Sequence, residues 1–264
     1  MSQTVNVDHM VLYFDHLDST NRVARQKALE NAPAGLVIRA GMQSAGRGQY
    51  DRSFASPLGG LYFSMLLRPE IAMVQLPLIT LAVGVACREV IFGQFKIEAG
   101  IKWPNDLYVG ERKIAGILCE SVLAGRGDTG PAVVAGVGLN VNSVLDDFPP
   151  PLQPIVTTLI EQTGFRSDLD KLLDALVQAI EAKVLLIGKA TNVLLKQWQN
   201  YDYLYSKPLV YTAGEKTIRG IGLGVSAQGQ YRFRDVSGQE HSVVGGQLRP
   251  QHDESDGKST TGVS

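Results

Sequence analysis

Residues 102–116 read KWPNDLYVGERKIAG, and this stretch decides how the rest of the chain is interpreted. Its proline predicts an extended bend, because a proline ring keeps the preceding residue out of the helical region. Residues 110–112 predict a turn, and Lys113 then opens an apolar strand that runs to residue 123. In a hairpin of this length Lys102 and Lys113 would lie close together, which is unfavourable without an anion between them. The stretch therefore predicts a site for a carboxylate or a phosphate.

The same residues also have ordinary structural explanations. Asn105 and Asp106 belong to the residue types that are common at turns, where their side chains cap the backbone. Lys113 would suit a strand at the edge of a sheet, where a lysine discourages pairing with another chain. The density of lysine, asparagine and aspartate within residues 102–113 favours the binding site over these explanations.

A second candidate is Gly46-Arg47-Gly48, inside the polar loop 43–57. Two glycines that flank an arginine let backbone N–H groups approach an anion, while the guanidinium supplies a forked donor and Arg52 adds a second charge. The loop is not a Walker motif, because no Gly-Lys-Ser/Thr follows it, and no helix opens after it as a dinucleotide fingerprint requires. A solvated surface turn stays an alternative for this loop.

A third candidate is residues 136–142, which read GVGLNVN. If the strand continues through them, alternation places Gly138, Asn140 and Asn142 on one face. A glycine beside asparagines leaves room for a flat ligand and supplies amide donors and acceptors. The alternative is a strand that runs into an asparagine-rich turn.

Strands and helices are predicted up to about residue 204. Asp18-Ser19-Thr20-Asn21 is a cluster of helix N-cap residues, which predicts a helix over 21–30. The apolar stretch 74–95 is interrupted by proline, glycine and charged residues, and this indicates a buried helix rather than a membrane span. Hydrophobic periodicity predicts further strands at 10–14, 37–42, 61–67, 97–103, 107–109, 113–123 and 131–142, and helices at 168–187 and 192–201.

From residue 208 the pattern changes to short strands separated by turns, at 209–211, 217–225, 230–234 and 241–244. This pattern is typical of a small SH3-like β-barrel. We therefore expect an α+β fold, with a mixed sheet and flanking helices in a domain at 1–204 and an SH3-like domain at 205–250. Residues 251–264 have almost no apolar content and are predicted to be a disordered tail.

Composition narrows the functional classes. The 264 residues carry a formal net charge of -1, which gives no electrostatic case for a nucleic acid or an anionic membrane as partner. Cys87 and Cys119 lie in apolar stretches without metal-ligand spacing and are predicted to be buried free thiols. The N-terminus shows no signal-peptide pattern, so we expect a cytoplasmic protein that works in a reducing, ATP-containing compartment.

Together these motifs resemble the biotin protein ligase family, also called biotin–[acetyl-CoA-carboxylase] ligases. The resemblance covers nearly the whole chain, from Ser19 to Pro250, and rests on Ser19-Thr20-Asn21, Gln43 with Gly46-Arg47-Gly48, and the stretches 102–106, 112–116 and 138–142. It implies a catalytic domain related in fold to class II aminoacyl-tRNA synthetases, followed by the SH3-like barrel. It also implies the activity of a biotin–[biotin carboxyl-carrier protein] ligase, in which ATP with Mg²⁺ converts biotin to biotinyl-5′-AMP and biotin then passes to a lysine of a carboxylase carrier domain.

The resemblance further implies roles for individual residues. Lys113 and Arg47 match the catalytic residues, and Asp106 matches a residue that organises the magnesium and phosphate region. The expected biotin pocket comprises Ser19, Thr20, Asn21, Gln43, Arg47, Gly48, Gln49, Lys113 and Gly116. The expected nucleotide-binding residues are Arg47, Arg52, Phe54, Lys102, Asn105, Asp106, Asn140 and Asn142.

Two positions depart from the pattern of many members of the family. Gln49 stands where they have an arginine, and Phe54 stands where they have a tryptophan that packs over the ligand. Because the lost arginine removes a charge, we expect the adenylate to be held less tightly here and released more readily.

Three alternative functions are weighed against this one. Lipoate protein ligase shares the fold and the adenylate chemistry, but residues 102–106 together with a C-terminal barrel favour biotin. Some biotin ligases are also transcriptional repressors with an N-terminal helix-turn-helix; only about nine residues precede the first predicted strand, so we expect a monofunctional enzyme without DNA binding. A non-catalytic biotin-binding module is the third alternative. The sequence leaves the oligomeric state open, with a homodimer among the options.

Overall fold

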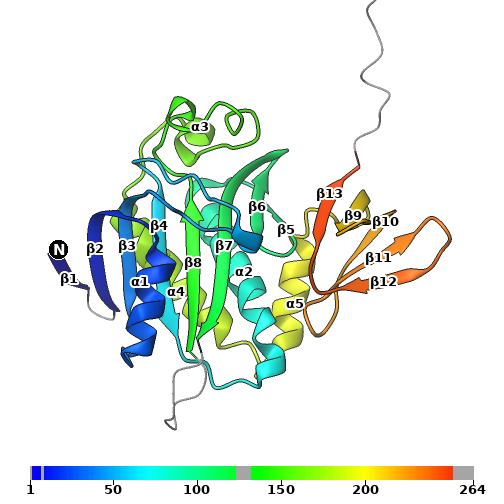
Figure 1. The fold of residues 1–264 in the computed structure, drawn as a ribbon, viewed down its shortest axis with the longest axis horizontal. Helices are drawn as coiled ribbons and strands as arrows, with labels where there is room; N and C mark the ends of the chain where they lie inside the picture. Colours follow the sequence, from blue (N-terminus) through cyan, green and yellow to red (C-terminus); the bar gives the residue numbers. More distant parts are fainter. Residues whose placement is uncertain (1, 7–8, 123–131, 252–264) are drawn as a thin grey trace, which may run out of the picture. The chain divides into compact units, whose positions relative to one another are not determined.

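The structure is a computed structural model, and it describes residues 2–6, 9–122 and 132–251. The described chain divides into two compact units (Figure 1). The first comprises the residues up to Tyr203 together with Ala227–Gly229, and the second comprises Leu204–Ser226 and the residues from Gln230 onward. Apart from Gln251, the tail predicted to be disordered lies outside the described residues.

A mixed eight-stranded sheet forms the centre of the first unit. Its strand order is β1-β2-β3-β4-β8-β7-β6-β5; β2 and β3 run parallel, and the other neighbouring pairs run antiparallel. The strands are β1 Ser2–Asn6, β2 His9–Leu17, β3 Val37–Gln43, β4 Leu61–Leu67, β5 Gly100–Lys102, β6 Asp106–Val109, β7 Arg112–Val122 and β8 Ala132–Leu139. The central strands β4 and β8 are almost wholly buried, which explains why they read as continuous apolar runs.

Helices cover both faces of this sheet. Helix α1 (Thr20–Leu29) packs on β3, β4 and β8, while α2 (Pro77–Phe95) packs on β5 and β7 of the opposite face and against α4 (Leu169–Val184) and α5 (Thr191–Asn200). Gly84 of α2 lies against the side chains of Ile101 and Ile117, which point away from the α1 side. Among the described residues, α2 covers one face of the sheet, while α1 and loop 43–57 stand over the other.

Helix α2 is the one described helix that is long and apolar enough to cross a membrane, and 56% of its most apolar window is buried inside the protein. Residues such as Leu78, Ala82 and Ile91 are inaccessible or nearly so. A helix in the core of a folded protein passes the same test of length and composition. The burial of α2 agrees with the buried helix that the interrupted apolar pattern of residues 74–95 predicts.

Several element boundaries differ from the prediction. The segment expected as one strand over 97–103 contains only the three residues of β5, and β8 ends at Leu139 instead of continuing to Asn142. The short helix α3 (Leu159–Thr163) was not predicted; its N-cap Thr158 accepts a hydrogen bond from Glu161 N at 3.2 Å. Short 3₁₀ turns occur at η1 Gln49–Asp51, η2 Met73–Gln75 and η3 Leu145–Asp147.

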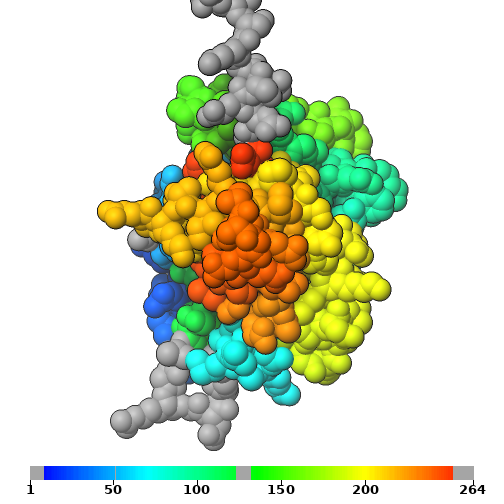
Figure 2. All heavy atoms as spheres, turned by 90° about the vertical axis from the view of Figure 1, so that its right-hand side faces the viewer, coloured from blue at the N-terminus to red at the C-terminus, as the bar shows by residue number. Residues whose placement is uncertain are grey.

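The second unit is a five-stranded antiparallel sheet in the order β12-β11-β10-β9-β13. Its strands are β9 Pro208–Ala213, β10 Lys216–Val225, β11 Tyr231–Asp235, β12 Glu240–Val243 and β13 Gln247–Pro250. Leu209, Tyr231 and Phe233 are buried, and the last two alternate along β11 with exposed arginines. Residues of the second unit form the orange surface that faces the viewer in Figure 2. The structure of the second unit therefore contains one strand, β13, that the sequence pattern did not predict.

Candidate active site

Three neighbouring strands, β4, β8 and β7, form the floor of the candidate site on the face that α1 covers. Their register aligns two rows of residues on this face, namely Tyr62, Gly138 and Gly116 in one row and Ser64, Gly136 and Leu118 in the next. Because side chains alternate along a strand, Glu120 points to the same face as Leu118. The glycines at the centre of both rows leave space that side chains from α1 and from loop 43–57 fill.

The first turn of α1 is tied to the end of β3. Gln43 Oε1 accepts a hydrogen bond from Thr20 N at 2.8 Å and lies 3.2 Å from Thr20 Oγ1. The first N–H groups of a helix have no partner within it, so this glutamine satisfies one of them. Gln43 Nε2 donates to Ser56 Oγ at 2.9 Å, which joins the helix start to the far end of loop 43–57. These bonds fix Ser19, Thr20 and Asn21, all of which are buried.

Asn21 is held by polar groups above the sheet. Its Nδ2 donates to Glu120 Oε2 at 2.8 Å and to Leu118 O at 3.1 Å, and its Oδ1 accepts from Ser64 Oγ at 2.6 Å. Gly136 is essential to this arrangement, because a Cβ there would lie 1.9 Å from Asn21 Oδ1. The predicted pocket residue Asn21 is thus rigidly oriented at the centre of the site.

Loop 43–57 folds back on itself beside α1. Gly48 N donates to Arg52 O at 2.7 Å and Phe54 N donates to Gly46 O at 2.8 Å. A Cβ on Gly46 would lie 2.4 Å from Phe54 O, so the close approach of the two chain segments requires glycine. The loop is therefore a built structure, which argues against a freely solvated turn.

Phe54 covers the glycine row of the floor. A Cβ on Gly138 would meet its ring at 2.5 Å and a Cβ on Gly116 would meet it at 2.9 Å, while the ring of Tyr62 lies edge-on with centroids 6.5 Å apart. The ammonium of Lys113 lies 5.4 Å from the centre of the Phe54 ring. Phe54 thus stands where many members of the family have a tryptophan. It lies between the glycines of the floor and the ammonium of Lys113.

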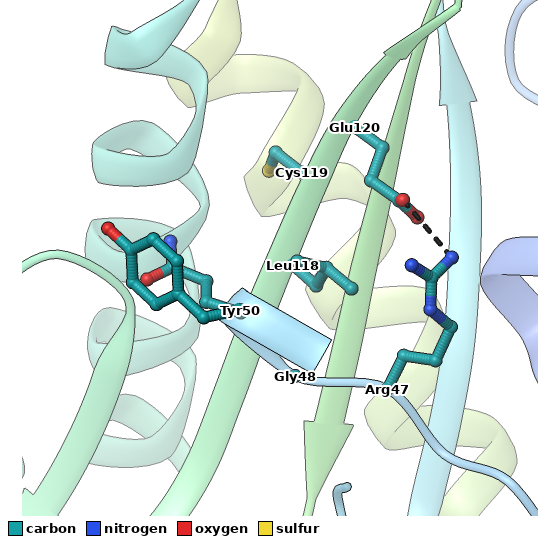
Figure 3. A pocket seen from close by; sticks show the side chains of 7 residues that line it. Arg47, Gly48, Tyr50, Leu118, Cys119 and Glu120 are labelled. Carbon is teal, nitrogen blue, oxygen red and sulfur yellow. Dashed lines mark hydrogen bonds and ion pairs between the residues drawn. The ribbon is translucent and has the colours of Figure 1, made fainter. Parts of the chain in front are cut away.

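A cavity of about 280 Å³ opens between the loop and β7. It is lined by Arg47, Gly48, Gln49, Tyr50, Leu118, Cys119 and Glu120. Figure 3 shows the guanidinium of Arg47 turned toward the carboxylate of Glu120, and Nη1 lies 3.3 Å from Oε1. The predicted phosphate-binding arginine therefore has an internal counter-ion.

Lys113 also has an internal counter-ion, since its Nζ lies 2.6 Å from Asp106 Oδ1. The expectation that Lys102 and Lys113 would be neighbours in one hairpin is wrong, because β6 lies between β5 and β7. Register pairs Lys102 with Asp106 and Lys113 with Tyr108. Lys113 is not at a sheet edge either, as β7 lies between β6 and β8, so the edge explanation for this lysine is excluded.

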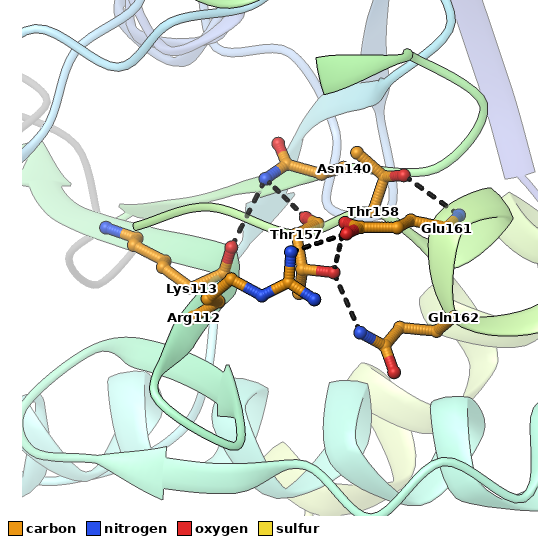
Figure 4. A network of polar contacts seen from close by, with 7 residues as sticks. All are labelled: Arg112, Lys113, Asn140, Thr157, Thr158, Glu161 and Gln162. Atoms are coloured by element: carbon orange, nitrogen blue, oxygen red, sulfur yellow. Dashed lines mark hydrogen bonds and ion pairs between the residues drawn. The ribbon is translucent and has the colours of Figure 1, made fainter. Parts of the chain in front are cut away.

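Asn140 follows the end of β8, next to the start of β7 (Figure 4). Its Nδ2 donates to Thr157 O at 3.0 Å and lies 3.5 Å from Lys113 O, while its Oδ1 is buried without a hydrogen-bond partner. A buried acceptor left unpaired costs about 1–3 kcal/mol, so this oxygen is a candidate for a further hydrogen-bond partner. Because β8 ends at Leu139, the prediction that Asn140 and Asn142 share a strand face with Gly138 is wrong.

The remaining predicted nucleotide-binding residues have structural partners or lie on the exterior. Both ends of the Asn142 amide bond the backbone of Ser167, at 2.9 Å and 2.8 Å. Asn105 Nδ2 donates to Ile117 O at 2.7 Å, which braces the hairpin. The ammonium of Lys102 lies 4.8 Å from the ring centre of Tyr108, and Arg52 lies on the exposed side of the loop.

Within the residues that the structure describes, no group of three histidine, cysteine, aspartate or glutamate side chains is placed to hold a metal ion. Burial raises the pKa of Cys87 and of Cys119 to about 12, so both thiols are protonated at neutral pH. The two cysteines are free, as predicted, but only Cys87 is buried and Cys119 is half-buried; neither is an activated nucleophile.

Sequence reasoning missed two polar residues of the site. Ser64 and Glu120 each stand inside an apolar strand, where a polar side chain needs a partner. Their spacing along β4 and β7 would have placed them on the glycine-lined face if the strand register had been known.

Comparison with known proteins agrees with this architecture. Residues 13–140 match the Biotin/lipoate A/B protein ligase family. This region includes α1, loop 43–57, the second half of β2 and strands β3 to β8.

Individual relatives indicate which branch of the Biotin/lipoate A/B protein ligase family the chain resembles. A protein of Paracoccus denitrificans named biotin–[acetyl-CoA-carboxylase] ligase is 30% identical over 84% of this chain and 93% of its own length. The bifunctional ligase/repressor BirA of Bacillus spizizenii is 35% identical over 83% of this chain and 67% of its own length. The chain belongs to the biotin protein ligase family.

Solved structures show the same fold. The biotin protein ligase of Aquifex aeolicus, in complex with biotin and ATP, superimposes with a TM-score of 0.80 at 26% identity, covering 91% of this chain and 99% of that one. The mixed sheet with helices followed by a small antiparallel unit is therefore the fold of this family, as the sequence predicts.

Proposed function

We propose that this protein is an ATP-dependent biotin–protein ligase, which forms biotinyl-5′-AMP and transfers biotin to a lysine of a carboxylase carrier domain. The observation that carries the proposal is the convergence of Thr20, Asn21 and Arg47 on one side of Phe54, with Lys113 on the other. This places neutral polar groups beside two cations in a single site. The relationship to proteins named biotin–[acetyl-CoA-carboxylase] ligase supports the same activity.

The neutral polar groups suit the ureido ring of biotin. Thr20, Asn21 and Gln43 are buried or half-buried, and their side chains are already fixed by hydrogen bonds before a ligand arrives. Polar groups that are fixed in advance lose little conformational freedom when a ligand binds. We assign Ser19, Thr20, Asn21, Gln43 and Gly116 to the wall around biotin, with Gly48 and Gln49 closing it from the loop.

The cations suit the first chemical step. The carboxylate of biotin attacks the α-phosphorus of ATP, the bond to the β-phosphate oxygen breaks, and pyrophosphate leaves. Arg47 and Lys113 would stabilise the negative charge that grows on the phosphoryl oxygens. Each is paired with a carboxylate in the ligand-free protein, so phosphate binding exchanges one anionic partner for another.

Asn140 would define the position of the adenine. Its buried Oδ1 lacks a partner, and the exocyclic amino group of adenine is a donor that would satisfy it. Mg²⁺ usually accompanies ATP and is held by one or two carboxylates together with phosphate oxygens. Asp106 fits the role of a single carboxylate near the phosphates, and a bound Mg²⁺ would supply further charge neutralisation there.

In the second step the neutral amine of an acceptor lysine attacks the carbonyl of the adenylate, AMP leaves, and the amine loses a proton. Positioning and electrostatics are sufficient for both steps, and no covalent enzyme nucleophile is needed. The acceptor is proposed to be a biotin carboxyl carrier domain, and the site of action the cytoplasm, where ATP and such carboxylases occur together.

Transfer of labelled biotin to a purified carrier domain tests this function. We expect label on the carrier when ATP and Mg²⁺ are both present, and none when the acceptor lysine is replaced by arginine. Labelled lipoate with a lipoyl domain serves as the parallel substrate. Transfer of lipoate in place of biotin would assign the protein to the sister activity, and binding of biotin without transfer would contradict the ligase assignment.

A further inference from the structure

Glu120 carries a charge inside an otherwise apolar stretch of β7, and its side chain is only 19% exposed. A carboxylate that is largely withdrawn from water is unfavourable unless it is hydrogen-bonded or paired. Its two oxygens have different partners: Oε2 accepts from Asn21 Nδ2 at 2.8 Å, and Oε1 lies 3.3 Å from Arg47 Nη1. These partners come from α1 and from loop 43–57, the two segments that stand over the floor of the site.

The carboxylate decides which way the Asn21 amide faces. An ionised carboxylate only accepts hydrogen bonds, so it selects the NH₂ end of the amide and leaves Oδ1 toward Ser64. The hydroxyls of Ser64 and Thr20 lie 2.8 Å apart, and Thr20 is bonded in turn to Gln43. The direction of the hydrogen bonds that run from Asn21 through Ser64 and Thr20 to Gln43 therefore follows from the carboxylate of Glu120.

The other oxygen fixes Arg47 across the cavity. Figure 3 shows the Arg47 side chain extended from the loop toward Glu120 of β7, with Leu118 beside it in this view. Arg47 is 43% exposed, and holding its long side chain in one rotamer costs conformational entropy that the ion pair with Glu120 helps to offset. The ion pair holds the guanidinium at the cavity mouth, where an incoming phosphate would meet it.

We propose that Glu120 is a positioning residue of the ligase reaction, which orients Asn21 toward biotin through one oxygen and holds Arg47 ready for the phosphate through the other. The proposal rests on the proposed function. It goes beyond that function by joining the biotin wall and the phosphate loop through a single carboxylate. Loss of the charge should consequently affect both biotin affinity and the rate of adenylation.

The test uses the full chain with Glu120→Gln, which keeps the size of the side chain and removes its charge. We expect biotin affinity measured without ATP to fall roughly 10-fold, and kcat for biotin-dependent pyrophosphate exchange to fall by a similar factor, because hydrogen bonds to charged groups are the stronger ones. Glu240→Gln is the matched control, since Glu240 pairs with Arg234 at 2.8 Å in the second unit. It should leave both quantities unchanged.

A double-mutant cycle separates positioning from general stability. In the Asn21→Ala background, Glu120→Gln should weaken biotin binding no further, because its effect on biotin passes through Asn21. Glu120→Asp, which keeps the charge, should restore part of the lost kcat. Unchanged kinetics in Glu120→Gln, a fully additive double mutant, or a loss that disappears once activity is divided by the folded fraction would each overturn the proposal. Absence of biotin-dependent exchange in the wild-type chain would instead refute the proposed function.

Discussion

Replacing Gly136 by alanine places a methyl group where the Asn21 side chain now lies. The new Cβ would stand 1.9 Å from Asn21 Oδ1 and 2.8 Å from its Cγ, so the amide must leave its position. Asn21 then loses its bonds to Leu118 O, Ser64 Oγ and Glu120 Oε2. At about 1 kcal/mol for each of the two neutral bonds and about 2 kcal/mol for the one to a carboxylate, the loss is about 4 kcal/mol. Alanine returns about 0.5–1 kcal/mol through the unfolded chain, which leaves a destabilisation of about 3 kcal/mol.

The double mutant with Asn21→Ala isolates this cause. Asn21→Ala alone loses the same three hydrogen bonds without the gain that alanine gives in place of glycine, so it should cost about 4 kcal/mol. Once the amide is gone, the methyl group that Gly136→Ala adds meets no obstacle from it. The double mutant should therefore be about as stable as Asn21→Ala, and far from the sum of about 7 kcal/mol that independent sites would give.

Urea unfolding followed by tryptophan fluorescence measures these differences. Both tryptophans of the chain, Trp103 and Trp198, are buried in the first unit, so the signal reports the unit that holds the mutations. Additive losses in the double mutant, or a Gly136→Ala variant as stable as the wild type, would show that Asn21 does not occupy the space above Gly136.

Three further predictions concern other parts of the molecule. Because burial raises the pKa of Cys87 to about 12, its thiolate is scarce at pH 8, and this wholly buried cysteine should not react with a thiol reagent until the protein unfolds; fast labelling of Cys87 in the native chain would be inconsistent with this. The His241 hydrogen bond depresses the pKa of Asp235 below its unfolded value, so its stabilisation is present above about pH 4 and is lost as pH falls through the folded pKa; Asp235→Asn should lower Tm at pH 7, and a deficit that did not shrink in acid would oppose this reasoning. Gln49→Arg should lengthen the lifetime of enzyme-bound biotinyl-5′-AMP by roughly 10-fold in a chase experiment, since it adds a charged donor at the cavity; an unchanged lifetime would mean that Gln49 does not govern retention.

Local patterns predicted most of the fold. The segment 61–67 was expected as a strand and is β4, because its run of apolar residues is buried on both faces. Helix α1 was expected from its N-cap residues and begins within one residue of the predicted start. Helix α3 escaped prediction because five residues carry too little periodicity, and its capping threonine is recognisable only with the structure in hand.

The site was harder to predict because its geometry is set by strand order. The sequence places Lys102 and Lys113 close along the chain, yet β6 inserts between their strands and supplies Asp106 as the anion. Glu120 and Ser64 are far apart in sequence and meet at Asn21 only because β4 and β7 flank β8. No short motif encodes such contacts.

Biotin-dependent exchange of labelled pyrophosphate into ATP tests the central claim most directly. The wild-type chain should exchange label with biotin and not with lipoate, and Lys113→Ala should abolish most of the exchange while the protein stays folded. That result would establish the adenylating step and the part that Lys113 plays in it. Exchange with lipoate alone, or no exchange with either acid, would contradict the account.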